Sequence, residues 1–426
     1  MSTTNDITIE GQPAVDDIVS EHRDWMVCHS CGQVQSIVAI SPEHEMVCFN
    51  CGEVLHEGRG PWLNQAIALT LAAFVLFLVC VFCPILTLEI GAQSQTVTIA
   101  DGLFALMERS NFILAALIFT TLFLFPAFDI AALMYLLIPY NFNKKFKGHA
   151  IILRWFNQVQ GWSMLEVFLL SMVVASIKMA DMAILHLEYG AYALFALVLI
   201  LIFINLKLDR QKLWSWININ NYFTHVVGES VVDCDSCKTM VGRSIVQSDG
   251  HCPRCGNEVH DRIPNSLEKT TAFTLAAAIL YIPANVLPIM TYSTLGEVET
   301  DTIFSGVVSL IAAELYGIAA IVFIASIGVP ILKLVILSYL IVAVRFRMKM
   351  GARHRAVLFR LTEFIGRWSM VDVFVVTIFV AIVQFGFVYT VESEGAIIAF
   401  GAVVVLTMIA AETFDPRLLW DAVDKK

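Results

Sequence analysis

Long apolar runs separated by short polar links dominate the chain after its N-terminal region. A helix rises about 1.5 Å per residue, so a run of about 18 residues or more can cross a hydrocarbon core of about 30 Å. The pattern therefore predicts eight transmembrane helices. They lie at residues 64–89, 111–139, 163–187, 190–207, 272–292, 316–343, 369–390 and 394–413.

The same residues occur twice, in the same order, along the chain. Trp162-Ser-Met matches Trp368-Ser-Met at an offset of 206 positions, and Pro126 matches Pro330 at an offset of 204. Matches that keep one order over the whole length are typical of a tandem duplication. The sequence thus predicts two repeats, each with one cysteine module followed by four membrane helices. An even number of helices gives both repeats the same orientation in the membrane.

Eight of the ten cysteines form two modules, each with two C-x-x-C motifs. Sixteen residues separate the motifs in the first module and fourteen in the second. A short C-x-x-C turn presents two sulfurs to one face of a tetrahedron, so this spacing predicts a closed, structural zinc site with four thiolates. Redox-active cysteines, iron and disulfides are alternatives. The predicted zinc ligands are Cys28, Cys31, Cys48 and Cys51, and Cys234, Cys237, Cys252 and Cys255.

Lysine and arginine gather in two equivalent links of the repeats. One link holds Lys144, Lys145, Lys147 and Arg154, and its counterpart holds Arg345, Arg347, Lys349, Arg353, Arg355 and Arg360. The loops on the opposite side are acidic or neutral. Because basic residues are enriched in short cytosolic loops, we expect both termini and both cysteine modules in the cytosol, where lasting disulfides are rare.

These patterns predict an all-α integral membrane protein, with eight transmembrane helices in two tandem parallel four-helix repeats. A small cytosolic zinc-ribbon module precedes each repeat. The N-terminal tail is polar and acidic, without the basic start or apolar core of a signal peptide, and is expected to be disordered. The predicted segments are the tail (1–24), zinc ribbon 1 (25–60), bundle 1 (61–210), zinc ribbon 2 (228–262), bundle 2 (265–415) and a C-terminal tail (416–426).

The composition supports a membrane protein and argues against other classes. Hydrophobic residues make up 58% of the chain and charged residues 15%, against about 45–50% and about 25% in soluble domains. The net charge of −10 is spread over loops and tails, and no basic block indicates a nucleic-acid partner. The sequence contains no P-loop, hydrolase elbow or kinase signature, so we do not expect an enzyme.

Ionisable residues stand within two predicted membrane helices of the second repeat. Such a residue costs at least about 2.5–3.5 kcal/mol on insertion, so it needs a partner or a function. Ser326 and Lys333 share a face of one helix, and Ser369 and Asp372 share a face of the next. With Thr407 of the last helix they predict a polar cluster in the cytosolic half of the bundle. The alternative is a buried structural pair, or a helix cap by Asp372.

The first repeat does not reproduce this set. Asp129 stands where the second repeat has its lysine, and Ser163 and Glu166 stand where it has Ser369 and Asp372. Two acids cannot form the pair that a lysine and an aspartate form. We therefore place the functional cluster in the second repeat and interpret the first-repeat set as its structural echo.

Five motifs, with the duplicated cysteine modules, resemble the paraquat-inducible protein A family. They are PANVLPIM (283–290), DTIFSG (301–306), FIASIGVP (323–330), GRWSMVDVF (366–374) and FDPRLLWD (414–421). Members are inner-membrane partners of MCE-domain tunnel proteins, which bridge the periplasm of bacteria with two membranes. The resemblance implies an inner-membrane component of an intermembrane phospholipid transport system, which loads lipid into such a tunnel or receives lipid from it.

The resemblance also implies roles for single residues. Ser326, Lys333, Ser369, Asp372 and Thr407 match the family's second-half motifs, which makes their cluster a candidate site for a lipid headgroup or for proton coupling. Two other function classes stay open. One is a redox- or metal-responsive membrane stress protein, and the other is an ion-coupled transporter of small polar solutes.

Overall fold

The computed structural model describes most of the chain in two compact units. A cysteine-rich unit comprises Met1–Gly60 and Asn218–Asp261, and a helical unit comprises Pro61–Ile217 and Arg262–Lys426. The predicted N-terminal tail and the last residues of the C-terminal tail lie outside the described residues. The residues that the structure describes are 25–28, 30–36, 45–57, 63–90, 93–108, 112–146, 148–179, 184–217, 231–248, 250–288, 290–294, 297–312, 314, 316–348, 351–382, 389–393 and 395–421.

The cysteine-rich unit is built from short antiparallel hairpins. Strands β1 and β8 contact each other, so both cysteine modules belong to one unit although they are far apart in the sequence. Helix α9 (Arg243–Ser248) follows the hairpin of the second module. The paired strands are β1 (Trp25–Val27) with β2 (Val34–Ser36), β3 (Glu45–Val47) with β4 (Val54–Glu57), and β8 (Val231–Asp233) with β9 (Met240–Gly242).

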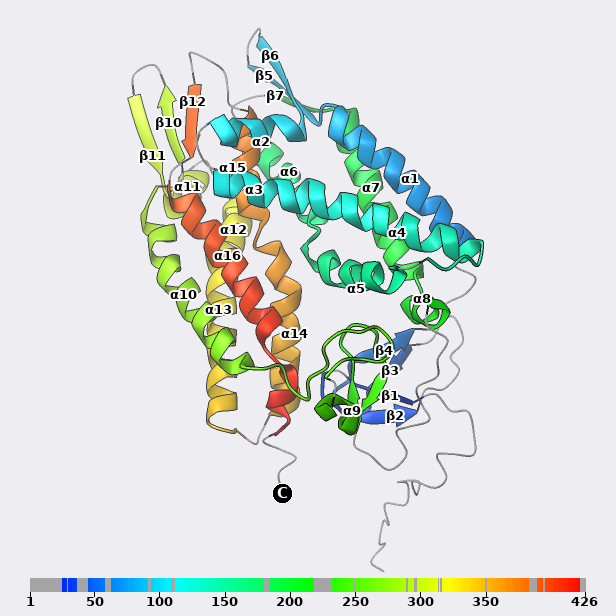
Figure 1. Cartoon of the computed structure of the whole chain (residues 1–426). Helices are drawn as coiled ribbons and strands as arrows, with labels where there is room; N and C mark the ends of the chain where they lie inside the picture. The colour runs from blue at the N-terminus through cyan, green and yellow to red at the C-terminus, as the bar shows by residue number, and fades with distance from the viewer. Residues whose placement is uncertain are drawn as a thin grey trace, which may run out of the picture. The chain divides into compact units, whose positions relative to one another are not determined.

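The helical unit contains two equivalent series of elements (Figure 1). The first is α1 (Leu63–Phe82), α2 (Ile99–Glu108), α3 (Phe112–Phe119), η2 (Thr120–Leu124), α4 (Phe125–Asn141), α5 (His149–Val159), η3 (Gln160–Trp162), α6 (Leu165–Met179), α7 (Tyr189–Lys207) and α8 (Arg210–Ile217). The second is α10 (Ser266–Val286), α11 (Ile303–Ala312), α12 (Tyr316–Phe323), η5 (Ile324–Gly328), α13 (Val329–Arg345), α14 (Ala352–Trp368), α15 (Val371–Ile382), α16 (Gly395–Thr413) and η6 (Pro416–Leu419).

Six helices among the described residues are long and apolar enough to cross a membrane. Each overlaps one of the predicted spans. The other two predicted spans stay predictions. The span 272–292 overlaps α10, and the span 369–390 contains α15; residues 383–388, beyond the end of α15, lie outside the described part. The six helices are Leu63–Phe82, Phe112–Asn141, His149–Ser176, Tyr189–Lys207, Ile324–Arg345 and Ala396–Thr413.

The prediction of an all-α fold is wrong at one end of the helical unit, where two small antiparallel sheets lie (Figure 1). Each sheet joins a hairpin to a strand from later in the same repeat, in the same order. The strands are β5 (Leu86–Ile90), β6 (Gln93–Val97) and β7 (Ile184–Leu187) in the order β6-β5-β7, and β10 (Met290–Thr294), β11 (Glu297–Asp301) and β12 (Tyr389–Ser393) in the order β11-β10-β12.

Four of these strands, β5, β7, β10 and β12, begin or lie within the apolar runs that predicted membrane helices. The predicted spans 64–89, 163–187, 272–292 and 369–390 each join a helix to the beginning or whole of a strand. A continuous apolar run has no period that separates a buried helix from a strand. Pro84, just after α1, was the local signal, because proline has no N–H for a helical hydrogen bond.

Wide helical turns precede the equivalent prolines Pro126 and Pro330. The backbone N–H of Phe125 donates to the carbonyl of Thr120, and that of Val329 donates to the carbonyl of Ile324. A proline within a helix removes one hydrogen bond and crowds the preceding turn, so a local π-turn relieves the contact. Such turns are frequent at functional sites. The second one, η5, contains Ser326 of the predicted cluster.

The two repeats meet along the equivalent helices α6 and α15 (Figure 1). The rings of Phe168 and Phe374 lie 5.7 Å apart and nearly perpendicular, at 89°. Ser171 donates a hydrogen bond of 3.0 Å to the backbone carbonyl of Val371. Since Phe168 and Phe374 are the same position of the duplicated motif, equivalent residues of the two repeats pack against each other here. The helices that follow the two Trp-Ser-Met steps therefore form the seam of the helical unit.

Candidate metal centres and polar sites

Each cysteine module brings four sulfurs together, all within 4.8 Å of one another. The Sγ atoms of Cys28 and Cys51 are 3.5 Å apart, and those of Cys234 and Cys255 are also 3.5 Å apart. A disulfide would need about 2.05 Å, whereas four sulfurs at about 2.3 Å from one tetrahedral ion lie about 3.8 Å apart. The described cysteines are all free thiols. Each cluster could therefore hold one metal ion, and the donor set fits zinc.

The four C-x-x-C turns share one backbone arrangement. In each turn, the backbone N–H of the residue four positions after the first cysteine donates a hydrogen bond to that cysteine's carbonyl. These residues take a left-handed backbone conformation, which favours glycine: Gly32, Gly52, Lys238 and Gly256, at φ of 76°, 73°, 55° and 70°. The turn geometry explains the glycines that follow three of the four motifs.

Burial raises the pKa of the Cys51 thiol to about 11. A metal ligand must be the deprotonated thiolate, so a metal ion that binds here displaces the thiol proton. Cys80, outside both modules, lies buried in α1 with its Sγ 3.9 Å from the carbonyl of Gly190, in keeping with a small buried hydrophobic residue.

The predicted cluster of the second repeat is buried within the helical unit. The Lys333 side chain is only 1% exposed, and its Nζ donates to the hydroxyl of Ser369 at 3.5 Å, a long hydrogen bond. Ser326 and Thr407 are buried as well, and Thr407 donates to the carbonyl of Val404 at 2.9 Å. Asp372 lies in the first turn of α15, but its side chain is outside the described part. The structure thus brings Lys333 and Ser369 together and leaves the pairing with Asp372 as a prediction.

A cavity of about 560 Å³ lies against the first-repeat set. The three equivalents of the second-repeat residues, Asp129, Ser163 and Glu166, all line it. Second-repeat side chains from α14 and α16 close the other wall, including Glu363 and Glu412. The cavity is therefore formed between the two repeats, and the first-repeat residues interpreted as an echo border open space.

Sequence reasoning missed several polar residues of this cavity. The predicted architecture places them at the ends of membrane spans or in the links between spans, where polar residues are ordinarily explained by contact with water and lipid headgroups. Only the interruption of apolar runs by short polar motifs such as NQVQG and INLKLDR marked them. These residues are Asn157, Gln160, Asn205, Arg210, Arg360 and Glu363.

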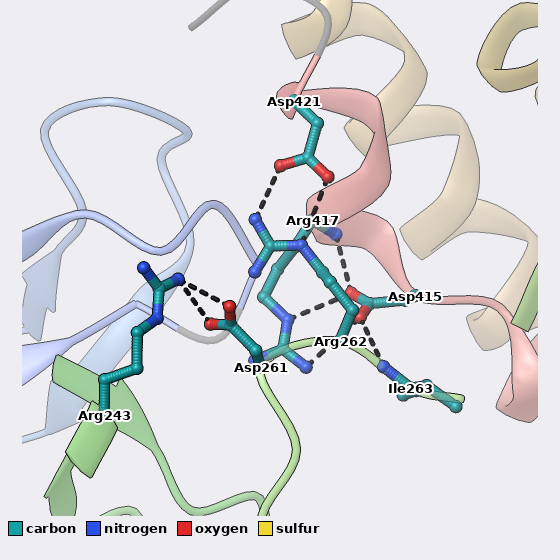
Figure 2. A network of polar contacts seen from close by, with 7 residues as sticks. All are labelled: Arg243, Asp261, Arg262, Ile263, Asp415, Arg417 and Asp421. Atoms are coloured by element: carbon teal, nitrogen blue, oxygen red, sulfur yellow. Dashed lines mark hydrogen bonds and ion pairs between the residues drawn. The ribbon is translucent and has the colours of Figure 1, made fainter. Parts of the chain in front are cut away.

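Acids and arginines at the end of the helical unit form a compact ionic network (Figure 2). Asp415 accepts hydrogen bonds from the backbone N–H groups of Ile263 and Arg417, both at 3.0 Å, and from the Arg417 side chain. Arg262 pairs with Asp421 at 2.6 Å, and this carboxylate raises the pKa of the guanidinium. The FDPRLLWD motif thus ties the segment before α10 to the segment after α16.

Comparison with known proteins decides the family. The family model described as paraquat-inducible protein A matches the chain twice, over residues 63–218 and 267–424. The chain belongs to this family. The two matches fall on the two equivalent series of helices. Both cysteine modules lie outside the matched segments.

Curated relatives cover nearly the whole chain. The chain is 29% identical over 402 residues to the lipophilic envelope-spanning tunnel protein A of Escherichia coli, which covers 94% of this chain and 92% of the relative. It is 27% identical over 407 residues to the E. coli intermembrane transport protein PqiA, with 93% and 95% covered. A probable intermembrane transport protein of Haemophilus influenzae is 27% identical over 404 residues, with 94% and 95% covered. No solved structure matches the chain.

Proposed function

We propose that this protein is the inner-membrane component of an intermembrane phospholipid transport system, which loads lipid into a periplasm-spanning MCE-domain tunnel or receives lipid from it. The observation that carries the proposal is the near full-length similarity to relatives named for intermembrane transport. One of those relatives is named a lipophilic envelope-spanning tunnel protein. The apolar helices agree with a protein that works from within a membrane.

The second-repeat cluster supplies groups suited to a phosphate headgroup. Lys333 would meet the phosphate as a point charge, and the hydroxyls of Ser326, Ser369 and Thr407 would donate hydrogen bonds. Asp372 would hold Lys333 in place or exchange a proton with it. Support comes from the burial of Lys333 beside Ser369, because an ammonium group inside an apolar bundle is costly unless it has a function or partner.

The cysteine modules would each hold one Zn²⁺ ion in a structural role. The four thiolates would fill the tetrahedral ion completely, which leaves no position for catalysis. Binding such an ion also stabilises the fold of a small module, because the sites do not exist in the unfolded chain. The basic links Lys144–Arg154 and Arg345–Arg360 favour a cytosolic location for the modules and for both termini, with the sheets on the periplasmic side.

Lys333→Met tests the transport role, because methionine fills a similar volume without the charge. The measurement is the transfer of labelled phospholipid between inner and outer membranes in cells that depend on this protein. We expect a loss of transfer while the protein level in the membrane stays normal. The matched control is Lys207→Met, which removes an exposed lysine at the end of α7. Normal transfer by the Lys333→Met protein would contradict the proposed role of the cluster.

The tunnel partner needs a separate test. We expect the full-length chain, extracted in mild detergent, to retain an MCE-domain protein from the same bacterium, and to place labelled lipid into it when both are reconstituted together. A chain that moves a small polar solute with an ion gradient, and neither binds an MCE protein nor moves lipid, would contradict the proposed function. A protein whose activity survives Lys333→Met but responds to oxidation of its cysteines would be a stress sensor.

A further inference from the structure

The cavity between the repeats has the size of a ligand site. Its volume is about 560 Å³, within the range of about 300–1,000 Å³ typical of small-molecule pockets. One water takes only about 30 Å³ of liquid. The wall is formed by residues from α4, α5, η3, α6, α7 and α8 of the first repeat and from α14 and α16 of the second. A group larger than a few waters therefore fits between the repeats.

Asp129 is an incompletely satisfied acid on this wall. Its side chain is 6% exposed, and its Oδ1 atom has no hydrogen-bond partner within the described protein. Ser163 bonds to the same carboxyl group, and the charge of Arg210 also acts on it. An ionised carboxylate that is buried without a full set of hydrogen bonds is costly. A donor from outside the chain would complete this site.

The polar wall beside Asp129 is held in place by its own contacts. The Gln160 side chain donates to the Asn205 amide oxygen and accepts from the Arg210 guanidinium. The guanidinium also lies over the ring of Phe156, 5.8 Å from its centre. Both ends of the Gln160 amide are thereby engaged. This amide cannot turn to supply the missing donor without breaking a contact.

The lining charges favour a cation. Four carboxylates line the cavity, from Asp129, Glu166, Glu363 and Glu412, against two guanidinium groups, from Arg210 and Arg360. The Trp162 indole N–H donates to Glu412 at 3.0 Å, which fixes one of these acids. An anionic ligand would add charge to an already acidic lining. A cationic group that can donate hydrogen bonds suits it better.

The duplication identifies the kind of cation. In the duplicated sequence, Asp129 of the first repeat is equivalent to Lys333 of the second, and Ser163 is equivalent to Ser369. The second repeat places the chain's own ammonium group against the serine, at 3.5 Å. The first repeat has a carboxylate against the equivalent serine, and adjacent space. We propose that the cavity between the repeats binds a primary ammonium group from outside the chain, with the Asp129 carboxylate as its acceptor.

Such an ammonium group has two sources, the ethanolamine headgroup of a phospholipid or a free soluble amine. In the lipid case the inference rests on the proposed function and deepens it, because it gives the system a preference for ethanolamine lipids. The negatively charged lining then excludes anionic headgroups. In the soluble case the cavity is a regulatory or transport site for a small amine.

The test compares lipids that differ only in the headgroup. The full-length protein is purified in detergent and exposed to equal amounts of phosphatidylethanolamine, phosphatidylglycerol and phosphatidylcholine. The lipids that stay bound are then identified and quantified by native mass spectrometry. We expect a preference for phosphatidylethanolamine, which falls about tenfold in Asp129→Asn because the charge-assisted hydrogen bond is lost. Lys207→Met should keep the preference. Melting temperatures of the variants show whether each is folded. If Asp129→Asn is not folded, Asp129→Ser replaces it in the comparison.

A second arm measures binding of free ethanolamine by calorimetry. Binding that is lost in Asp129→Asn, without any lipid preference, supports the ammonium site with a soluble source. Equal retention of the three lipids together with no ethanolamine binding overturns the inference. Retention of phosphatidylcholine equal to that of phosphatidylethanolamine in the wild type overturns the lipid source, since the choline group has no N–H to donate. In Lys333→Met we expect transport to fail while the ethanolamine preference remains, which separates this inference from the proposed function.

Discussion

Asp415 is a completely buried carboxylate that organises the end of the helical unit (Figure 2). Its oxygens accept from the backbone N–H of Ile263 and from the backbone and guanidinium N–H groups of Arg417, at 3.0–3.2 Å. Arg417 is itself only 5% exposed. Asp415→Ala therefore removes the carboxylate from a buried guanidinium and the acceptor from a backbone amide. Breaking a buried pair in this way costs about 3–5 kcal/mol.

Asp421→Ala is the matched control, because it also removes one carboxylate from an arginine of the same network. The Arg262–Asp421 pair has a shorter contact, 2.6 Å, but its two side chains are 40% and 41% exposed. Water and salt screen such a pair, and its loss is expected to cost only about 0.2–1 kcal/mol. The comparison thus separates burial from distance. The shorter ion pair should be the weaker contributor to stability.

The assay is the free energy of unfolding of the full-length protein in mixed micelles, followed by tryptophan fluorescence as a denaturing detergent is added. Both variants are measured in the same lipid and salt. When the same measurement is made at high salt, the effect of Asp421→Ala should become smaller still and that of Asp415→Ala should stay nearly unchanged. If the two variants differ by less than about 1 kcal/mol, the Asp415–Arg417 pair is as well solvated as its neighbour and the reasoning from burial fails.

Three further predictions concern the packing and the metal sites. Gly190→Ala should destabilise the helical unit by about 1–3 kcal/mol, because the new Cβ would lie 2.6 Å from the carbonyl oxygen of Pro84. The control Gly317→Ala places its Cβ in open space, and its free energy of unfolding should stay within about 1 kcal/mol of the wild type in the same assay. Truncation of Phe168 and Phe374 to alanine, singly and together, should give a coupling of about 0.5–1.5 kcal/mol across the seam; additive losses would contradict the ring contact. Cys234→Ser should lower the bound zinc, measured by mass spectrometry of the metal, from two ions per chain to one; two retained ions would show that the cluster is not the site.

Local patterns predicted what depends on nearby residues. The C-x-x-C turns need only four residues each, and their sulfurs come together as expected within each module. The duplication was visible in the order of the motifs, and the elements of the two repeats follow one another in the same series. The family resemblance rested on the same motifs and is confirmed.

Contacts between distant segments were beyond the sequence. The strands β5 and β10 each pair with a strand from later in their repeat, and their residues read simply as the ends of apolar helices. The cavity depends on α14 and α16 of the second repeat, which close a space beside residues of the first. No spacing along the chain predicts that meeting. The seam of α6 and α15, which brings the repeats together, decides it.

The duplicated Trp-Ser-Met step contains one serine in each repeat, and the partners of these serines show how the repeats diverged. Ser369 accepts a hydrogen bond from the chain's own lysine, Lys333, whereas Ser163 bonds to Asp129 at the edge of a cavity. A duplication preserved only for packing would need neither charge, because a buried ionisable residue costs free energy that an apolar one does not. Opposite charges at one position, in two bundles that share a seam, favour two sites of complementary preference. The site that we propose in the second repeat suits a phosphate, and the site that we propose beside Asp129 in the first repeat suits an amine.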